Sequence, residues 1–542
     1  MFKTNDNHLR PTLFSPENTM KNTMKERLNG HWSGVFYQKI FKTIDESTFS
    51  PLYSSENGRP NFPVNILAGL EILKELHGLT DEQLYENYLF NYTYQRALGI
   101  ENIEDYLFEL RTLYYFRARL AEYEEEHEES LYLNVFQNIR DDIISELGLK
   151  TGYQRIDSVM IAANIKKMNR LMLFHKVYTN LVKDIQSEGI FLNEKYTKFL
   201  GEDEDALSFK LKKEEVPVKL QEIAQRLSQL VERFRGSPSV AEIQSYQDAV
   251  RLLGEQTRKD DNNLRLIPAE EISSSSMQNP ADGDATYRKK NGTEYRGYSL
   301  HAAETCDPEN PVQIITDVVL TQNNVDDAAT FKERIPEMRK ETGLSTAIVD
   351  GGYVSDETRD AACESGVGLI ASAIRGKKVS DSALNTYSFE YDDRGLILKC
   401  PAGERPRSQK KNRDGELSAN FDPATCNSCF LKKRCITTVS ENSARVVIDK
   451  HRIWLDTRQE LLKTEGYKRL CRLRPAVEGL MEKMKPKELN GRTRFRGKER
   501  VTSRMILKAI GLNFRRYRAW LNDLMLSILN LRYLSEKKVF AA

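Results

Sequence analysis

Hydrophobic residues recur at helical spacing through much of the first 150 positions. From Pro63, apolar side chains repeat every three or four residues and stop at Gly78, which predicts a helix that ends at this glycine. Thr80 followed by Gln83 is a capping-box pattern, and the apolar spacing continues behind it. We therefore expect two helices joined by a very short turn.

A third helical run covers residues 105–123 and is basic. Arg111 and Arg117 lie among its apolar positions, and a further amphipathic helix is expected over residues 134–150. Three short helices with a basic third member are typical of DNA-binding domains, although a plain helical bundle fits the composition equally well. We interpret residues 1–150 as an N-terminal helical DNA-binding domain, with the two arginines as candidate DNA contacts.

The period changes from helix to strand at residues 153–162, and Asp157 interrupts the predicted strand. Alternation predicts two faces, one with Arg155, Asp157 and Val159 and the other with Ile156, Ser158 and Met160. Asp is disfavoured inside strands, so its presence calls for a reason. A turn residue at a strand end is the alternative, but no glycine or proline follows for many positions. The pattern favours a functional carboxylate.

Strands and helices then alternate up to residue 373, with a helical insertion at about residues 190–280. The apolar strand at 345–349 runs into Asp350 and two glycines. Open α/β sheets bind ligands at this edge, and glycines allow a close approach, whereas an Asp-Gly turn is the ordinary alternative. We predict residues 151–373 as the first part of an α/β catalytic core.

Four cysteines follow in a region of different character, after a hairpin expected around Asp393 to Gly395. They are Cys400, Cys426, Cys429 and Cys435. This spacing fits a tetrahedral zinc site, which would stabilise a module too small for its own core. Four reduced structural thiols are the alternative, and His451 is a substitute ligand. We predict residues 374–450 as a β-rich, Cys-containing zinc-binding insertion.

Residues 468–500 place a carboxylate, Glu478, within a strongly cationic helical segment in which Pro475 must lie in the first turn or kink the helix. At helical spacing one face carries Arg474, Glu478, Glu482 and Lys485. From this window alone, a surface helix with paired charges is the favoured interpretation. We predict residues 451–542 as the last part of the catalytic core with basic C-terminal helices.

Charge is segregated along the chain. The 542 residues carry a net charge of only +2, yet residues 485–518 contain twelve Lys and Arg against two Glu. This local excess indicates a polyanionic partner. The candidate phosphate contacts are Arg474, Lys485, Arg492, Arg494, Arg496 and Lys498.

Targeting signals are missing from the pattern. No run approaches the roughly 18 apolar residues of a membrane helix, and the first residues lack the apolar core of a signal peptide. The seven cysteines, four of them clustered, argue against a secreted disulfide framework. We expect a cytoplasmic protein that does not bind membranes.

Three carboxylates, Asp157, Asp350 and Glu478, are distant in sequence but could meet in such a fold, two on neighbouring strands and one on a returning helix. Carboxylate oxygens suit two Mg²⁺ ions. In such a site one ion activates the attacking water or 3′-hydroxyl and the other stabilises the leaving oxygen of a phosphoryl transfer. The neighbouring Arg and Lys residues would hold the phosphodiester backbone.

The ordered set of motifs resembles the DDE-class transposases of bacterial insertion sequences. The resembling segments are Pro63, Gly78-Leu-Thr80 and Leu98-Gly99, then Arg155-Ile-Asp157-Ser158 with Ala162-Ala-Asn164, Gly297-Tyr298-Ser-Leu-His301, Ile348-Val-Asp350-Gly-Gly352-Tyr353, and the spacing of Arg474, Glu478 and Lys485. Ser299 stands where the family has Lys, and Cys471 stands where it has a Tyr that helps to arrange the DNA end.

The resemblance implies a ribonuclease H-like catalytic domain with a mixed sheet and flanking helices. It also implies a DNA transposase that binds the terminal inverted repeats of its element, hydrolyses phosphodiester bonds and joins the 3′-hydroxyl ends to target DNA. Two Mg²⁺ ions, with Mn²⁺ as a substitute, structural Zn²⁺, a homodimer in the synaptic complex and a nucleoid-associated location are further expectations. A domesticated DNA-binding protein and a structure-selective nuclease of the same fold are the alternatives.

Overall fold

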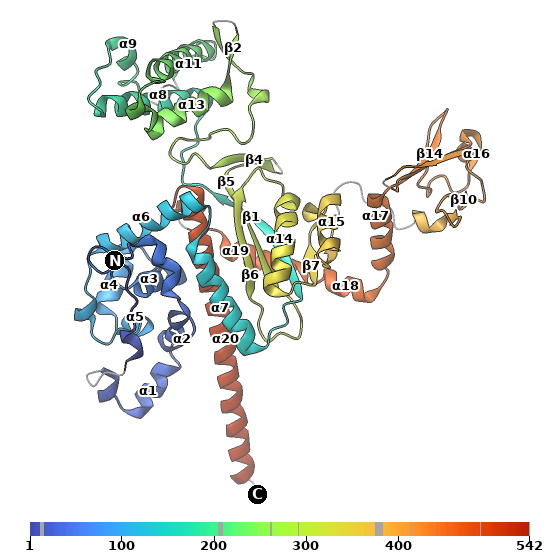
Figure 1. The fold of residues 1–542 in the computed structure, drawn as a ribbon. Coiled ribbons are helices and arrows are strands. Elements are labelled where there is room, and N and C mark those ends of the chain that lie inside the picture. Colours follow the sequence, from blue (N-terminus) through green and yellow to red (C-terminus); the bar gives the residue numbers. More distant parts are fainter. Residues whose placement is uncertain are drawn as a thin grey trace. The chain divides into compact units, whose positions relative to one another are not determined.

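The computed structural model describes residues 1–10, 16–203, 207, 210–260, 263–290, 292–373, 383–413, 415–487 and 489–540. The chain, drawn in Figure 1, divides by its contacts into two compact units. Unit 1 combines Met1–Lys150, Ser158–Asp326 and Gly479–Ala542, and unit 2 combines Thr151–Asp157 and Asp327–Glu478. Each unit is therefore built from segments that are far apart in the sequence.

Unit 1 begins with a group of helices. Their bounds are α1 (Asn22–Asn29), α2 (Trp32–Lys39), α3 (Val64–His77), α4 (Asp81–Phe90), α5 (Tyr92–Ala97), α6 (Leu110–His127) and α7 (Leu131–Leu147). α3 ends at Gly78, whose φ of 69° is a left-handed conformation that glycine adopts at low cost. The capping box of Thr80 and Gln83 is present at the start of α4. Both predicted helix boundaries are confirmed.

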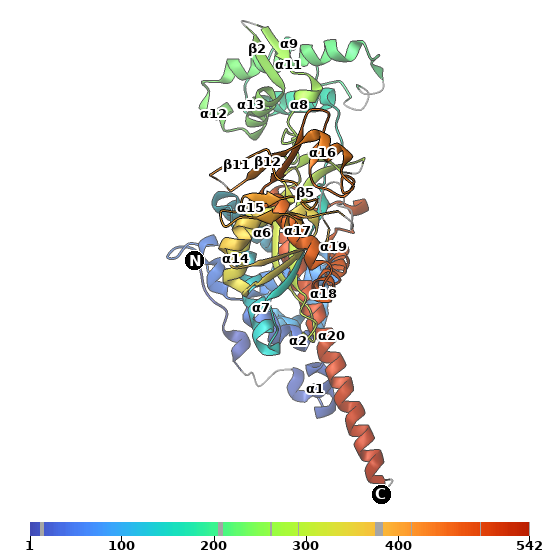
Figure 2. The same cartoon turned by 90° about the vertical axis from the view of Figure 1, so that its right-hand side faces the viewer.

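The last helix of the chain, α20 (Lys498–Phe540), belongs to the same unit. It packs against α3 and α7 from the N-terminal helices and against strand β6 (Ile315–Gln322). Figures 1 and 2 both show α7 running beside the first part of α20. The N-terminal helices and the C-terminal helix therefore share one core.

Strand β1 (Tyr153–Ala162) contributes its first half to unit 2 and its second half to unit 1. In unit 1, β5 (Thr293–Thr305) pairs antiparallel with β4 (Thr286–Lys290) and with β6. β5 also adjoins the end of β1, and a Cβ at Gly297 would lie only 2.2 Å from the carbonyl oxygen of Ile161. This close approach explains the glycine of the Gly-Tyr motif.

In unit 2, β1 pairs in parallel with β7 (Thr346–Val349), and β7 pairs in parallel with β8 (Gly368–Ala371). α14 (Asp327–Thr342) packs on α15 (Asp356–Glu364), and α15 contacts β8. Because parallel and antiparallel strands are joined through β1, the sheet is mixed, with helices beside it. The predicted α/β class with an N-terminal helical region is confirmed.

Burial along β1 departs from simple alternation. Gln154 and Ile156 are buried, as are Val159 and Ile161, so the buried positions change phase between Asp157 and Ser158. Burial does not follow the predicted faces, because Ile156 is buried whereas Ser158 and Met160 are partly exposed. The direction in which these side chains point stays a prediction. The change of phase falls where β1 passes from one unit to the other.

The helical insertion of unit 1 has a core of its own. Its elements are α8 (Arg170–Ser187), α9 (Glu194–Thr197), α11 (Glu215–Phe234), α12 (Pro238–Ala241), α13 (Gln244–Gln256) and the hairpin of β2 (Thr257–Asp260) and β3 (Asn263–Leu266). Apolar side chains of α8, α11 and α13 form one buried cluster. Gly236 lies between the end of α11 and the start of α12.

The Cys-containing part of unit 2 is β-rich. It contains β9 (Glu390–Tyr391), β10 (Ile397–Lys399), β11 (Ser408–Lys411), β12 (Leu417–Phe421), α16 (Pro423–Ser428), β13 (Thr438–Val439) and β14 (Ala444–Ile448). Four of the strands form an antiparallel sheet in the order β11-β12-β14-β13, and β9 and β10 form the expected hairpin. A small buried apolar cluster includes Phe421 of β12 and Val446 of β14.

Two helices, α17 (Lys450–Leu461) and α18 (Glu465–Cys471), lead from this region to a 3-10 turn at Arg474–Ala476 and then to α19 (Val477–Met484). Pro475 explains the interruption, because it lacks the N–H that a continuing helix would need and sits at the start of a new one. The helical segment is therefore broken at this proline.

Candidate active site

Two of the predicted catalytic carboxylates come from neighbouring parallel strands of unit 2. In the pairing of β1 with β7, Arg155 lies opposite Ile348. Asp157 and Asp350 each follow two residues later, so the same register puts them level with each other just where β7 ends. Adjacent strands lie about 4.8 Å apart, so the two carboxylates can share one cation.

Asp350 is oriented by the turn that follows it. Its Oδ1 accepts a hydrogen bond of 2.7 Å from the backbone N–H of Gly352, which caps the short 3-10 helix Gly351–Tyr353. This bond occupies one carboxylate oxygen and leaves Oδ2 for the site. The Asp350 side chain is 38% exposed, so the position is open to solvent.

Glu478 lies in the first turn of α19, and its side chain is 69% exposed. The segment before it is tied to β1, because Nη1 of Arg155 donates a hydrogen bond of 2.9 Å to the carbonyl oxygen of Leu473. Arg155 precedes Asp157 by two residues on the strand. The strand that carries the first carboxylate therefore also holds the backbone next to Arg474.

Arg474 joins the three carboxylates. Its Nη2 is 2.7 Å from Oδ2 of Asp157 and 3.7 Å from Oδ2 of Asp350, and its Nη1 is 3.4 Å from Oε1 of Glu478. The Arg474 and Asp157 side chains are only 15% and 14% exposed, so this pair is the buried part of the site. All three predicted catalytic residues are brought together around a single guanidinium.

The donor set suits a hard cation, because carboxylate oxygens are the ligands that Mg²⁺ and Mn²⁺ prefer. As the side chains stand, no group of three or more His, Cys, Asp or Glu residues in the described part of the chain is placed to hold a metal ion. The place between the carboxylates is taken by a guanidinium. The three carboxylates are suitable ligands for a divalent cation, but in this structure the Arg474 guanidinium lies between them.

The basic segment after α19 is anchored within unit 1. Thr493 donates its backbone N–H to the carbonyl oxygen of Ala162 at 2.9 Å, and Arg496 donates Nε to the carbonyl oxygen of Asn164 at 2.8 Å. Arg492 and Arg494 also donate to backbone carbonyls, with the arginine at 492 exposed. These arginines are therefore held in place rather than extended freely.

The other predicted DNA contacts differ in how they are engaged. Lys485 pairs with Glu482 at 2.7 Å, and Lys498 lies 3.7 Å from Glu499. Arg111 is exposed on α6. The two lysines therefore form ion pairs with neighbouring glutamates at the surface.

Arg117, on the same helix as Arg111, is committed to an ion-pair cluster. Its guanidinium donates to Glu71 at 2.8 Å and to both carboxylate oxygens of Asp81 at 2.9 and 2.7 Å. The hydrogen bonds from Arg117 and Lys74 overcome burial and lower the pKa of Asp81 to about 2. Arg117 therefore holds α6 against α3 and α4, and a DNA contact from it stays a prediction.

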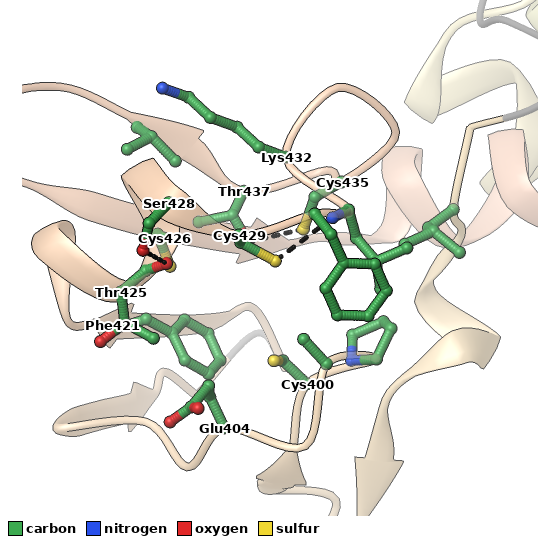
Figure 3. Close-up of a pocket in the computed structure, with 16 residues that line it drawn as sticks. Cys400, Glu404, Phe421, Thr425, Cys426, Ser428, Cys429, Lys432, Cys435 and Thr437 are labelled. Carbon is green, nitrogen blue, oxygen red and sulfur yellow. Dashed lines mark hydrogen bonds between the residues drawn. The ribbon is translucent and has the colours of Figure 1, made fainter.

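The four cysteines of the β-rich part line one pocket of about 270 Å³ (Figure 3). They come from three places in the chain, the turn after β10, helix α16 and the loop before β13. Burial, together with the other three cysteines nearby, raises the pKa of Cys426 to about 11. The four thiols line one pocket, but as the side chains stand no three of them in the described ranges are placed to hold a metal ion.

Two features of the site were not foreseen from the sequence. Arg155 had no assigned role, although its place on the Asp157 side of the strand was a usable signal. Arg474 was expected to face DNA, whereas it lies among the carboxylates. The spacing of four residues between Arg474 and Glu478 indicated their contact, but nothing local indicated the contact with Asp157.

A mixed sheet whose neighbouring parallel strands carry Asp157 and Asp350, followed by a helix that carries Glu478, is consistent with the ribonuclease H-like fold of DDE transposases. Two family models match the chain, one described as a transposase DDE domain over residues 399–518 and one as a transposase domain (DUF772) over residues 23–119. Both matches support an insertion-sequence transposase of the DDE class. No curated protein and no solved structure matches it significantly.

The two matches fall on informative parts of the chain. The first covers the four cysteines, Arg474 and Glu478, and the second covers α1 to α5 and part of α6. Such domains belong to DNA transposases, a group that usually depends on divalent metals. In the described ranges, no helix is both long enough and apolar enough to cross a membrane.

Proposed function

We propose that the protein binds the ends of its insertion sequence, hydrolyses phosphodiester bonds there and joins the 3′-hydroxyl ends to target DNA. Asp157, Asp350 and Glu478 are the ligands of two Mg²⁺ ions in this proposal, with Mn²⁺ as a substitute. The observation that carries it is the meeting of three carboxylates, from two parallel strands and a following helix, at one positive charge.

When bound, the ions would supply an activated water or 3′-hydroxyl and stabilise the leaving oxygen. The chain's own groups set the geometry. Asp157 is the fixed ligand because it is buried in a strand, and Asp350 is restrained through the Gly352 N–H. Glu478 is the exposed ligand and the one most free to adjust as DNA enters. Arg155 acts as a positioning residue through Leu473.

DNA binding is assigned to cations outside the triad. The proposed phosphate contacts are Arg474, Lys485, Arg492, Arg494, Arg496, Lys498, Arg111 and Arg117. Support is strongest for Arg492 and Arg496, which are exposed on an anchored segment, and for Arg111 on α6. Anchored cations lose little freedom when they meet a phosphate, which favours binding of the backbone. Terminal repeats, target DNA, a synaptic homodimer and a nucleoid location complete the proposal.

A structural zinc ion held by Cys400, Cys426, Cys429 and Cys435 is part of the same proposal. The support is the convergence of four thiols on one pocket in a module with a small apolar core. Thiolates are the ligands that structural zinc sites use most. The four thiols would have to close around the ion.

The test is cleavage of DNA that carries the flanks of the protein's own gene, with Mg²⁺ or Mn²⁺. Asp157→Ala, Asp350→Ala and Glu478→Ala should each lower cleavage by at least about 100-fold, because each loss removes a ligand that fixes the reacting metals. DNA binding should stay nearly unchanged. Glu482→Ala is the matched control, since its carboxylate pairs with Lys485 instead of joining the triad.

Three results would change the proposal. If Glu478→Ala cleaves DNA normally and Glu482→Ala does not, the third metal ligand is Glu482 instead of Glu478. Cleavage without strand transfer would favour the structure-selective nuclease. If the wild type binds its element's ends yet is as inert as the alanine variants with either metal, the domesticated DNA-binding protein is the better description.

A further inference from the structure

The Arg474 guanidinium occupies the place that a cation must take to serve all three carboxylates. Nη2 faces both aspartates and Nη1 faces Glu478, each within 4 Å. The arginine is 15% exposed while Glu478 is 69% exposed, so the positive charge lies deeper than the outermost ligand. An arginine that only awaited DNA would extend toward solvent, and this one points inward.

The charges explain why the arginine lies inward. Three carboxylates gathered at one point repel one another, and a single guanidinium offsets only part of their negative charge. Nε of Arg474 is buried and has no hydrogen-bond partner among the described residues, so the guanidinium is held mainly through its two terminal nitrogens. A buried nitrogen without a partner carries a desolvation cost. The carboxylates therefore attract the guanidinium strongly, but one of its N–H donors, Nε, has no acceptor among the described residues.

A divalent cation and the guanidinium cannot occupy this place together. Mg²⁺ requires oxygen ligands at about 2.1 Å in near-octahedral geometry, and Oδ2 of Asp157 already contacts Nη2 at 2.7 Å. Two cations at such a distance would also repel each other. Metal binding and the inward arginine are therefore alternatives.

We propose that Arg474 is the resident countercharge of the carboxylate triad in the metal-free protein, and that a divalent cation binds by displacing its guanidinium. The inference rests on the proposed function in one respect, since it takes the three carboxylates as metal ligands. It adds that the Arg474 guanidinium lowers the affinity of the three carboxylates for a metal ion as long as it lies among them.

The backbone can stay in place during the exchange. Leu473 is held to β1 by the hydrogen bond from Arg155, and α19 begins three residues after Arg474. Only the long Arg474 side chain has to turn outward. A displaced guanidinium is a good partner for a phosphate, to which it can donate two parallel hydrogen bonds. By linkage, a phosphate that captures Arg474 raises the affinity for the metal by the same factor that the metal raises the affinity for the phosphate.

The experiment measures Mn²⁺ binding to the full-length protein without DNA, by electron paramagnetic resonance of the free ion. Arg474→Gln removes the competing charge and should tighten Mn²⁺ binding about tenfold or more, within the usual range of such couplings. Arg472→Gln is the matched control, because that arginine lies two residues away and pairs with the exposed Glu465. Its Mn²⁺ affinity should equal that of the wild type.

Two further variants test whether the guanidinium is the competing group and whether Mn²⁺ binds at the three carboxylates. Arg474→Lys retains a charge but lacks the two-nitrogen fork that reaches both aspartates and Glu478, so its Mn²⁺ affinity should lie between those of the wild type and Arg474→Gln. Asp157→Asn should abolish the binding in every background, which places the ion at the triad. Circular dichroism shows whether each variant is folded.

The possible outcomes separate the two proposals. Equal or weaker Mn²⁺ binding by folded Arg474→Gln and Arg474→Lys would overturn the displacement and make Arg474 a positioning residue. If no protein in the series binds Mn²⁺ at millimolar concentrations, the carboxylates are not metal ligands and the proposed function fails with the inference. Tighter binding in Arg474→Gln that Asp157→Asn abolishes supports both.

Discussion

Glu124 is a buried acid that links α6 to the C-terminal helix, and its replacement by Gln tests the electrostatics of unit 1. The side chain is 1% exposed, and it accepts hydrogen bonds from Ser130 at 2.7 Å and from Ser503 of α20 at 2.8 and 2.7 Å. Burial outweighs these hydrogen bonds, and nearby Glu499 adds repulsion, so the pKa of Glu124 rises from 4.5 to about 7.

The sign and size of the pH effect follow from this difference. Below pH 4.5 both the folded and the unfolded states hold the proton. Between pH 4.5 and 7 the unfolded state releases it while the folded state retains it, so the free energy of unfolding falls as the pH rises. Above pH 7 both states are ionised and the loss is complete. The full difference corresponds to about 3 kcal/mol, of which about 2 to 3 kcal/mol falls between pH 5 and pH 8.

In Glu124→Gln the side chain stays neutral at every pH, and its amide can use the same two hydroxyls. We therefore expect the variant to match the wild type at about pH 5 and to be more stable by about 2 to 3 kcal/mol at pH 8. Hydrogen exchange of peptides from α6 and α20, compared at each pH, measures this directly, because it does not assume that the whole chain unfolds in one step.

Glu122→Gln supplies the control, since Glu122 is an exposed residue on the same helix. An identical pH response in both variants would show that the effect is a general one of net charge. A constant difference between Glu124→Gln and the wild type from pH 5 to pH 8 would refute the argument from burial.

Two further predictions concern the metal and the DNA. The purified protein should carry about one zinc ion per chain, and Cys426→Ser should lose it; elemental analysis without zinc, together with four freely reactive thiols in the folded wild type, would exclude the site. DNA affinity should fall steeply with salt, and Arg492→Gln should lower the slope of the logarithm of the affinity against that of the salt concentration by about one, because one phosphate contact is lost. An affinity that does not change from low to moderate salt would contradict this.

Much of the local structure could be predicted because it follows from local rules. The capping box at Thr80, the glycine stop at Gly78 and the ten-residue strand of β1 are each encoded by a few neighbouring residues. Placing Asp350 at the end of a strand needed only an apolar run and the residue after it. These features depend on short-range sterics and hydrogen bonds, which the order of residues determines.

Other features depend on partners that are distant in sequence. The change of burial phase in β1 depends on what covers each half of the strand, and no alternation pattern contains that information. The packing of α20 against α3 and α7 joins the two ends of the chain, and no pattern within one of these helices identifies its partner. Arg117 looked like a DNA contact because its charge was visible in the sequence, whereas its acidic partners Glu71 and Asp81 lie 46 and 36 residues away.

The role of Arg474 shows why the site needs the structure. The contact between Arg474 and Glu478 at four residues' spacing is indistinguishable in the sequence from a surface ion pair, and an exposed pair of that kind contributes little. Burial makes the difference, because Asp157 and Arg474 are both about 85% covered while Glu478 remains open. An arginine so placed must neutralise the aspartates first and the glutamate second. The charge that the sequence assigned to DNA is thus already paired with carboxylates inside the protein.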